Sequence, residues 1–271
     1  MTSAWVGAWR TMTHGRRSLF PSMILVLLAI SAVHAQVLSP IPGYLQDVAG
    51  QFAMPDEFSF EQEIQAATQA NSSNGNPFGY WHGVQIRPWF HYDGLRNTTL
   101  TASANYIDYF SVPGTSNYSH PEWRVTAMGT LKQRLSGGSV YEQSRFELLN
   151  FRDSNGVTQH LPRVRFRFGQ DLYLGKGSSR PYLGVYEEAI LQFPKSSYSH
   201  VTFEGARFFA GYGFDWGART HVLLGFKAVG EVSSSGSTVT LYYGPAVSID
   251  CTFGSHPMNE KHKRTTAFKD F

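Results

Sequence analysis

Charged side chains that alternate with apolar ones are the feature of this 271-residue sequence with the clearest chemistry. Arg163, Arg165 and Arg167 are separated by single apolar residues, and the segment before them carries Arg145 and Glu147. Residues two apart on an extended strand point to the same face, so we expect each set to share one face. Arginines on such a face either pair with carboxylates or bind an anionic ligand.

Two interpretations of these charges follow from the hairpin that residues 153–160 indicate. The hairpin brings Glu147 opposite Arg165 or Arg167. Cross-strand opposite charges stabilise an adjacent pair by roughly 0.2–1 kcal/mol. The pattern therefore predicts a salt-bridged plug that fills a small barrel, or alternatively a surface that binds an anion or a lipid headgroup.

A second hairpin, through residues 194–200, extends the cluster. It lets Glu187 face Arg207. Glu187 and Glu188 are adjacent and must point to opposite faces of a strand, and the sequence leaves open which of them points inward. We assign the candidate binding cluster to Arg145, Glu147, Arg163, Arg165, Arg167, Glu187 and Arg207.

Serine and histidine offer a different chemistry, the hydrolysis or transfer of lipid acyl groups at a barrel rim. Two similar motifs end in Ser119-His120 and Ser199-His200. Adjacent residues on a strand point to opposite faces, so neither pair forms a dyad by itself, whereas a nucleophile needs a base within hydrogen-bond reach. No Gly-x-Ser-x-Gly nucleophile elbow occurs. We therefore predict no catalytic residue and keep a rim Ser/His enzyme as the alternative.

Metal and cofactor chemistry has weaker support. The single Cys251 excludes a disulfide framework and a cysteine-based zinc site. His256 and His262 have an unspecific spacing in a basic tail. No P-loop, dinucleotide fingerprint or calcium-loop spacing is present. We expect no metal and no cofactor.

The elements that position these residues are strands, because alternating polarity recurs along the chain. Most of the runs have 12 to 16 residues, whereas an ordinary strand has about 5–6 and a membrane-crossing strand needs about 9–11. The nine clear runs are 79–92, 98–110, 122–135, 139–152, 161–173, 181–193, 201–214, 219–229 and 238–253.

Loop lengths indicate how the strands are connected. Short and long connections roughly alternate, as tight periplasmic turns and longer extracellular loops do. An even strand number then requires one more strand before residue 79. The segment 58–70 alternates weakly, although its Glu, Gln and Ala favour helix. We expect it to be a strand that pairs with 238–253 and closes an antiparallel up-and-down transmembrane barrel of ten strands, with eight to twelve as the range.

The direction in which the apolar face points separates two kinds of barrel. A membrane barrel turns it to lipid, whereas a lipocalin-like exported barrel turns it inward to hold a ligand. Periodicity alone fits both. Strand length, loop alternation and the placing of Tyr80 and Tyr92 at the two ends of one strand favour the membrane barrel.

A targeting segment precedes the strands. Arg16 and Arg17 are followed by the apolar run 23–33 and by Ala35. This is the pattern of a secretory signal peptide, cut after Ala35, and the run is too short for a membrane-spanning helix, which needs about 20 residues. The predicted organisation is a signal peptide at 1–35, a periplasmic segment at 36–57, the barrel at 58–253 and a basic tail at 254–271.

The stretch 122–226 resembles a family of uncharacterised Gram-negative outer-membrane barrels, a domain of unknown function with arginine-rich alternating strands. The motifs that carry the resemblance are Glu122-Trp123-Arg124, Arg145-Phe146-Glu147, 163–167, Tyr186-Glu187-Glu188 and 204–208. The strand that ends at Phe253 also resembles the terminal-aromatic assembly signal of outer-membrane proteins. The resemblance implies a fold and a location, and no reaction.

The predicted function is that of a non-enzymatic outer-membrane β-barrel with a charged, largely occluded lumen and a structural, binding or small-solute role. Expected partners are outer-membrane lipids, the barrel-assembly machinery during insertion, and a small anionic solute or lipid headgroup. Beyond residue 35 the chain has 20 basic and 20 acidic residues, which argues against nucleic acid as a partner.

Overall fold

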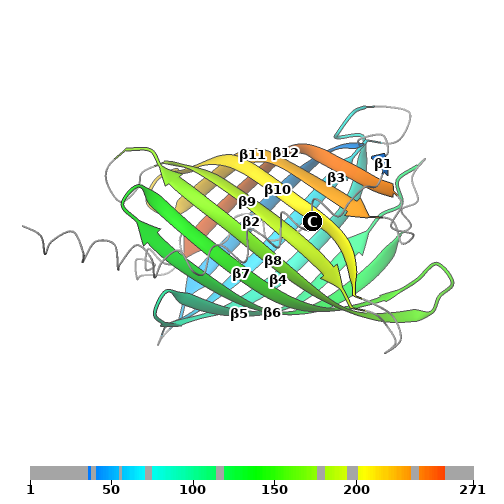
Figure 1. The fold of residues 1–271 in the computed structure, drawn as a ribbon, viewed down its shortest axis with the longest axis horizontal. Coiled ribbons are helices and arrows are strands. Elements are labelled where there is room, and N and C mark those ends of the chain that lie inside the picture. The colour runs from blue at the N-terminus through cyan, green and yellow to red at the C-terminus, as the bar shows by residue number, and fades with distance from the viewer. Residues whose placement is uncertain are drawn as a thin grey trace, which may run out of the picture.

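The computed structural model describes residues 36–37, 41–54, 57–70, 75–113, 119–175, 181–193, 201–232 and 238–253, and the regular structure in them is all β-strand (Figure 1). The strands are β1 (Gln36–Val37), β2 (Ile41–Ala53), β3 (Phe58–Gln69), β4 (Tyr80–Leu95), β5 (Thr98–Tyr109), β6 (His120–Leu135), β7 (Gly138–Arg152), β8 (Thr158–Tyr173), β9 (Tyr182–Gln192), β10 (Thr202–Asp215), β11 (Thr220–Val232) and β12 (Thr238–Phe253).

One sheet contains all of these strands and closes on itself. From β2 to β12 each strand pairs antiparallel with the next, and β12 returns to pair with β2 in parallel. The two-residue β1 also pairs in parallel with the beginning of β12. The predicted all-β barrel is confirmed. Its wall has eleven long strands, one more than the ten expected and within the range of eight to twelve.

The closure of the barrel differs from the prediction. Phe58–Gln69 is a strand, as expected against its helix propensity. It does not pair with 238–253, however, because β2 lies between them and pairs with both β3 and β12. The barrel therefore begins at Ile41 and not at residue 58. Pro42, Gly43 and Gly50 weaken the polarity alternation of β2, which hid this strand in the sequence.

The connections divide into two groups at opposite ends of the barrel. At one end, here called the turn end, β4–β5 and β6–β7 are joined by two residues each, and β2–β3 and β10–β11 by four. At the other, the loop end, β3–β4 and β5–β6 are joined by ten residues each. The β8–β9 connection is the long exception at the turn end. The predicted segments 1–35 and 254–271 and the motif ending at His200 lie outside the described residues.

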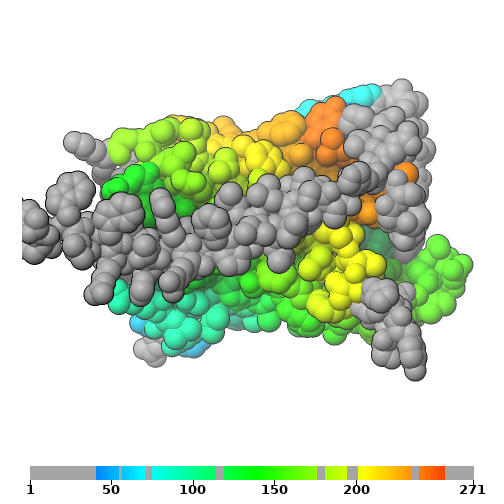
Figure 2. All heavy atoms as spheres, viewed as in Figure 1, coloured from blue at the N-terminus to red at the C-terminus, as the bar shows by residue number. Residues whose placement is uncertain are grey.

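Opposite faces of the wall have opposite polarity. The outer face, part of which is seen in Figure 2, exposes large apolar side chains. The inner face buries charged and amide side chains on every strand from β2 to β8. Examples of the exposed residues are Val48, Ile64, Ile86, Phe90, Leu100, Trp123, Val125, Phe146, Leu183, Val185, Phe208, Leu224, Phe226 and Phe253.

Within the described residues, no helix is long and apolar enough to cross a membrane.

Aromatic rings fill part of the interior toward the turn end. Tyr182, Tyr186, Phe209 and Leu223, from β9, β10 and β11, belong to one buried cluster. A Cβ atom at Gly225 would overlap the ring of Phe209. The wall therefore needs glycine there, because the missing side chain makes room for the ring.

Candidate functional site

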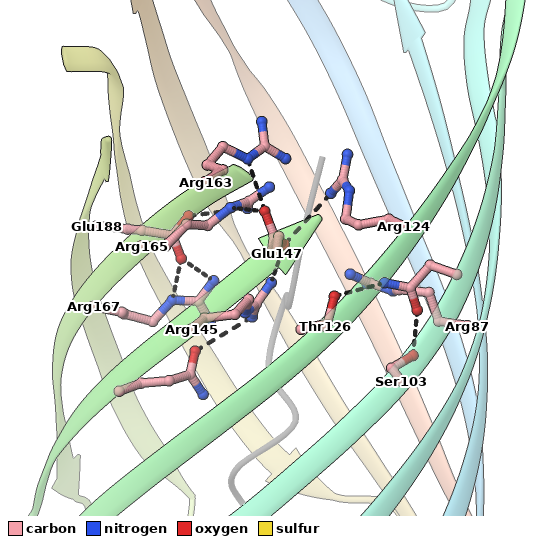
Figure 3. A network of polar contacts seen from close by, with 12 residues as sticks. Arg87, Ser103, Arg124, Thr126, Arg145, Glu147, Arg163, Arg165, Arg167 and Glu188 are labelled. Carbon is pink, nitrogen blue, oxygen red and sulfur yellow. Dashed lines mark hydrogen bonds and ion pairs between the residues drawn. The ribbon is translucent and has the colours of Figure 1, made fainter. Parts of the chain in front are cut away.

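Glu147, in the middle of β7, is the centre of a buried cluster of arginines (Figure 3). Its Oε2 accepts hydrogen bonds from Nε of Arg163 and Nε of Arg165, both at 2.8 Å. Its Oε1 lies 3.6 Å from Nη1 of Arg145 and 3.7 Å from Nη1 of Arg124. One carboxylate from β7 thus meets arginines from β6, β7 and β8.

Glu188 on β9 forms the second centre of this cluster. Arg167 donates to its Oε2 through Nε at 2.9 Å and Nη2 at 2.7 Å. Nη1 of Arg165 lies 3.3 Å and Nη1 of Arg207 lies 3.4 Å from its Oε1. Arg165 therefore links the two carboxylates (Figure 3). We call the following residues the arginine cluster: Arg124, Arg145, Glu147, Arg163, Arg165, Arg167, Glu188 and Arg207.

The structure buries Arg163, Arg165 and Arg167 inside the barrel, while the residues between them point outward. This is the arrangement that their alternation predicts. Glu147 pairs in register with Arg163 and not, as the hairpin predicted, with Arg165 or Arg167, although it does contact Arg165 diagonally. The role of these residues in binding stays a prediction.

Glu187 does not join the cluster, and its predicted pairing with Arg207 is wrong. It points outward, in register with Phe168 and Phe208, and Glu188 takes the inner position opposite Arg207. The outward phase of β9 is set by Leu183 and Val185, which are exposed. Because Leu183, Val185 and Glu187 are all odd-numbered, counting along β9 from the two apolar residues would have predicted Glu187 outside and Glu188 inside.

A second polar group faces the arginine cluster from β2, β3 and β4. Nη2 of Arg87 lies 2.5 Å from Oε1 of Glu63, whose Oε2 accepts from the Trp89 indole at 2.6 Å. Gln65 donates to both Glu63 and Asp47. In this group three buried acids, Asp47, Glu61 and Glu63, accompany one arginine.

The two groups meet across the lumen at Trp89. The guanidinium carbon of Arg87 lies 5.4 Å from the Trp89 ring centre, and that of Arg145 lies 5.7 Å from it. Arg87 and Trp89 come from β4 and Arg145 from β7. A cation–π contact thus joins β7 to β4, which are separated in the wall by β5 and β6. No local pattern indicates Arg87, Glu63 or Trp89 as partners, because contacts across a lumen depend on how the sheet curves.

A cavity of about 350 Å³ lies between the arginine cluster and the loop end. We call it the loop-end chamber. Nη1 of Arg163 pairs with Oε1 of Glu204 at 2.7 Å beside it, and Nη2 of Arg163 is buried with no hydrogen-bond partner among the described residues. The charged residues and histidines that border the chamber are His82, His120, Glu122, Arg124, Arg163, Glu204, Arg207 and Glu231.

A family model described as a protein of unknown function (DUF2490) matches residues 43–227. The chain belongs to this family. The match runs from Gly43 in β2 to Lys227 in β11 and contains the whole arginine cluster. The expected membership of an uncharacterised family is therefore confirmed. The comparison with curated proteins found no match.

The DUF2490 barrel also contains two sets of side chains in which a histidine lies between an acid and a hydroxyl. Nε2 of His91 lies 3.4 Å from Oε2 of Glu61, and its Nδ1 lies 3.1 Å from Oγ1 of Thr101. This order of groups can activate a hydroxyl when a substrate reaches it. Thr101 is buried inside the barrel.

The second of these two sets lies at the turn end of the DUF2490 barrel. Nδ1 of His221 is 2.9 Å from Oδ1 of Asp215, and Nε2 of His221 is 3.1 Å from the Tyr182 hydroxyl. Tyr182 is almost completely buried in the aromatic cluster. Neither set was predicted from the sequence, since the members of each set lie on different strands. Of the predicted rim histidines, His120 stacks on Tyr109 with ring centres 4.8 Å apart.

Proposed function

We propose that this chain is an outer-membrane β-barrel whose lumen is plugged by its own charged side chains and whose loop-end chamber binds a small anionic group. The observation that carries the proposal is the inverted polarity of the wall. On β7, Phe146 is 51% exposed, whereas its neighbours Arg145 and Glu147 are 1% and 0% exposed. An apolar exterior around a polar interior is the arrangement that lipid requires, and it is the reverse of a soluble ligand-binding barrel.

The plug is supported by the size and burial of the side chains that meet in the lumen. Arg87, Trp89, Arg145 and Arg165 are among the largest fully buried side chains, and they come from strands on different parts of the wall. Partnered charges of this kind stay buried because each is compensated by an opposite charge. We therefore propose that the barrel conducts no ions and acts by binding or as a structural component of the membrane.

The proposed location also uses the targeting segment and the strand ends. Residues 1–35 have the signal pattern, with cleavage after Ala35, and β12 ends in the aromatic Phe253 that barrel-assembly machinery would engage. Short turns at one end and longer loops at the other support a periplasmic turn end and an extracellular loop end.

Single cysteines test this location. In a Cys251→Ser background, Phe146→Cys lies on the outer wall and Asn155→Cys lies in an exposed loop-end turn. In intact cells a water-soluble maleimide should label position 155 and spare position 146, because lipid covers the latter. Both should react after denaturation in hot detergent. Equal labelling in intact cells would contradict a membrane-embedded wall.

A further inference from the structure

The parallel contact between β12 and β2 is interrupted near the loop end. Pairing stops at Tyr243 with Pro42 and resumes at Ala246 with Leu45. Pro245 lies in the gap and, like Pro42, has no N–H to donate. A Cβ atom at Gly244 would overlap the carbonyl oxygen of Gly43, so the two backbones touch there without continuing the ladder. We call this interruption the seam.

A cavity of about 90 Å³ lies at the seam. Tyr44 and Leu45 are adjacent on β2 and point to opposite faces, yet both border it. The same holds for Gly244 and Pro245 on β12. The lining surface is mostly apolar, and Ala67, Val229, Tyr242 and Tyr243 contribute to it beside the polar Thr68, Gln69, His82, Lys227 and Glu231.

This seam cavity adjoins the loop-end chamber, since His82 and Glu231 border both. Lys227 borders the seam cavity on the lumen side. Among the described residues, the two cavities together are bordered by four basic and three acidic side chains. Nη2 of Arg163 is a buried donor with no acceptor in the part of the chain that the structure describes. The seam cavity, whose lining surface is mostly apolar, thus adjoins a chamber bordered by three basic and three acidic side chains, and Lys227 at the seam cavity adds a fourth base.

We propose that the barrel binds an amphiphile with one hydrocarbon chain and an anionic head. The head occupies the loop-end chamber, where it accepts a hydrogen bond from Arg163, and the chain leaves through the seam cavity into the surrounding bilayer. The seam cavity is narrow, so it admits a single chain, and the rest of the chain lies among the lipids. This inference rests on the proposed membrane location and names the ligand class of the proposed binding role.

Photolabelling in phosphatidylcholine vesicles tests the inference on the full barrel. The probe is dodecanoate with a diazirine near its methyl end, and crosslinks are mapped by mass spectrometry. We expect them to concentrate in residues 41–45 and 242–245 and to be suppressed by unlabelled dodecanoate. Dodecanol has the chain without the charge, and acetate has the charge without the chain, so neither should suppress them.

Variants separate the two parts of the site. Val229→Trp fills the seam cavity and should abolish the focused crosslinks, whereas Leu224→Trp, on the outer face of the same strand, should keep them. Arg163→Gln should weaken the competition by dodecanoate about tenfold, the effect of one lost charge-assisted hydrogen bond, and Arg163→Lys should restore part of it. If Arg163→Gln does not fold, Arg207→Gln removes the neighbouring guanidinium instead.

Crosslinks spread evenly around the outer wall, or equal competition by dodecanol, would overturn the inference. Competition by acetate as strong as by dodecanoate would restrict the site to a free anion and refute the passage through the seam. Each variant is first checked for heat-modifiable migration in gels and for resistance to carbonate extraction. Those two measurements report the proposed membrane location alone, so its failure is distinguishable from failure of the ligand site.

Discussion

Glu147 is the shared counter-charge of several arginines. Two arginines donate to it at 2.8 Å, and two more lie within 3.7 Å. Taking two opposite charges out of water is costly, so a buried pair adds little to stability, but removing one partner leaves the other charge uncompensated. The arginine cluster is therefore sensitive to the loss of its few carboxylates.

Glu147→Gln is predicted to lower the free energy of unfolding by about 3–5 kcal/mol, because it leaves buried arginines without a counter-charge. Urea unfolding of the barrel in detergent micelles, followed by tryptophan fluorescence, measures this change. Glu142→Gln, on the outer face of the same strand, is the control and should have a much smaller effect. A small effect at both positions would mean that water solvates the cluster.

The adjacent acids of β9 give a matched pair of variants. Glu188→Gln removes the counter-charge of Arg167 and should also cost about 3–5 kcal/mol. Glu187→Gln changes an outward side chain and should stay within about 0.5 kcal/mol of the parent. The same unfolding measurement compares them. A larger loss of stability for Glu187→Gln than for Glu188→Gln would mean that Glu187, and not Glu188, points into the barrel.

Residue patterns predicted only part of this site. Strict alternation placed Arg163, Arg165 and Arg167 on one face, because side-chain direction in a strand is a local property. The contacts of Arg87 with Glu63 and of Arg145 with Trp89 are set by closure of the sheet. Nothing local in the sequence indicates them.

Among the elements, β2 and its parallel pairing with β12 depart furthest from expectation. The runs from residue 79 onward are long and alternate cleanly, so their strands were predicted to within a few residues. β2 contains two glycines and a proline that blur its alternation, and an even strand number left no place for it. The seam is also where the ladder is broken.

The register of that closure predicts a crosslink. Val48 of β2 and Ile249 of β12 are partners on the outer face. Cysteines at positions 48 and 249, in a Cys251→Ser background, should form a disulfide in the folded barrel. Cysteines at 64 and 249 should not, because β2 separates their strands. Gel mobility with and without reductant distinguishes the two pairs, and a crosslink only in the second would reinstate β3 as the closing strand.

Two glycines near the loop end should differ in their tolerance of a methyl group. Gly244→Ala places a Cβ atom on the backbone of Gly43 and is expected to cost about 1–3 kcal/mol through forced strand movement. Gly230→Ala meets Val239 at 3.5 Å, an ordinary contact, and should be tolerated. The temperature of heat-modifiable migration compares the two variants. Equal tolerance would show that the seam opens readily.

As a whole molecule, the barrel combines an apolar exterior with an interior filled by its own side chains. Fold class followed from the sequence because it depends on alternation summed over many strands. Alternation alone did not decide which face of the wall is apolar, and strand length and loop lengths were needed to favour an apolar exterior. The charge pattern also predicted a salt-bridged plug, but not its packing, since packing depends on the sizes of side chains that meet across the lumen. Glycines opposite Phe209 and the stacked Arg87, Trp89 and Arg145 are examples.

Electrical recording tests the filled interior. The parent barrel in a planar bilayer should show no steady conductance, because fully buried side chains leave no continuous water path. Trp89→Ala removes the ring on which Arg87 and Arg145 meet and should produce intermittent conductance. Trp123→Ala, on the outer wall, is the control and should stay silent. Steady conductance by the parent would refute the plug.

The parallel closure has one more consequence, which concerns sidedness. Because β2 runs in the same direction as β12, the chain enters the wall at the loop end, before Ile41, and leaves it at the turn end, after Phe253. In the proposed membrane location, an odd number of crossings puts the first residue of β2 and the last residue of β12 on opposite sides of the membrane. An epitope inserted just before Ile41 should be accessible to antibody on intact cells, and one inserted just after Phe253 should become accessible only when the outer membrane is permeabilised.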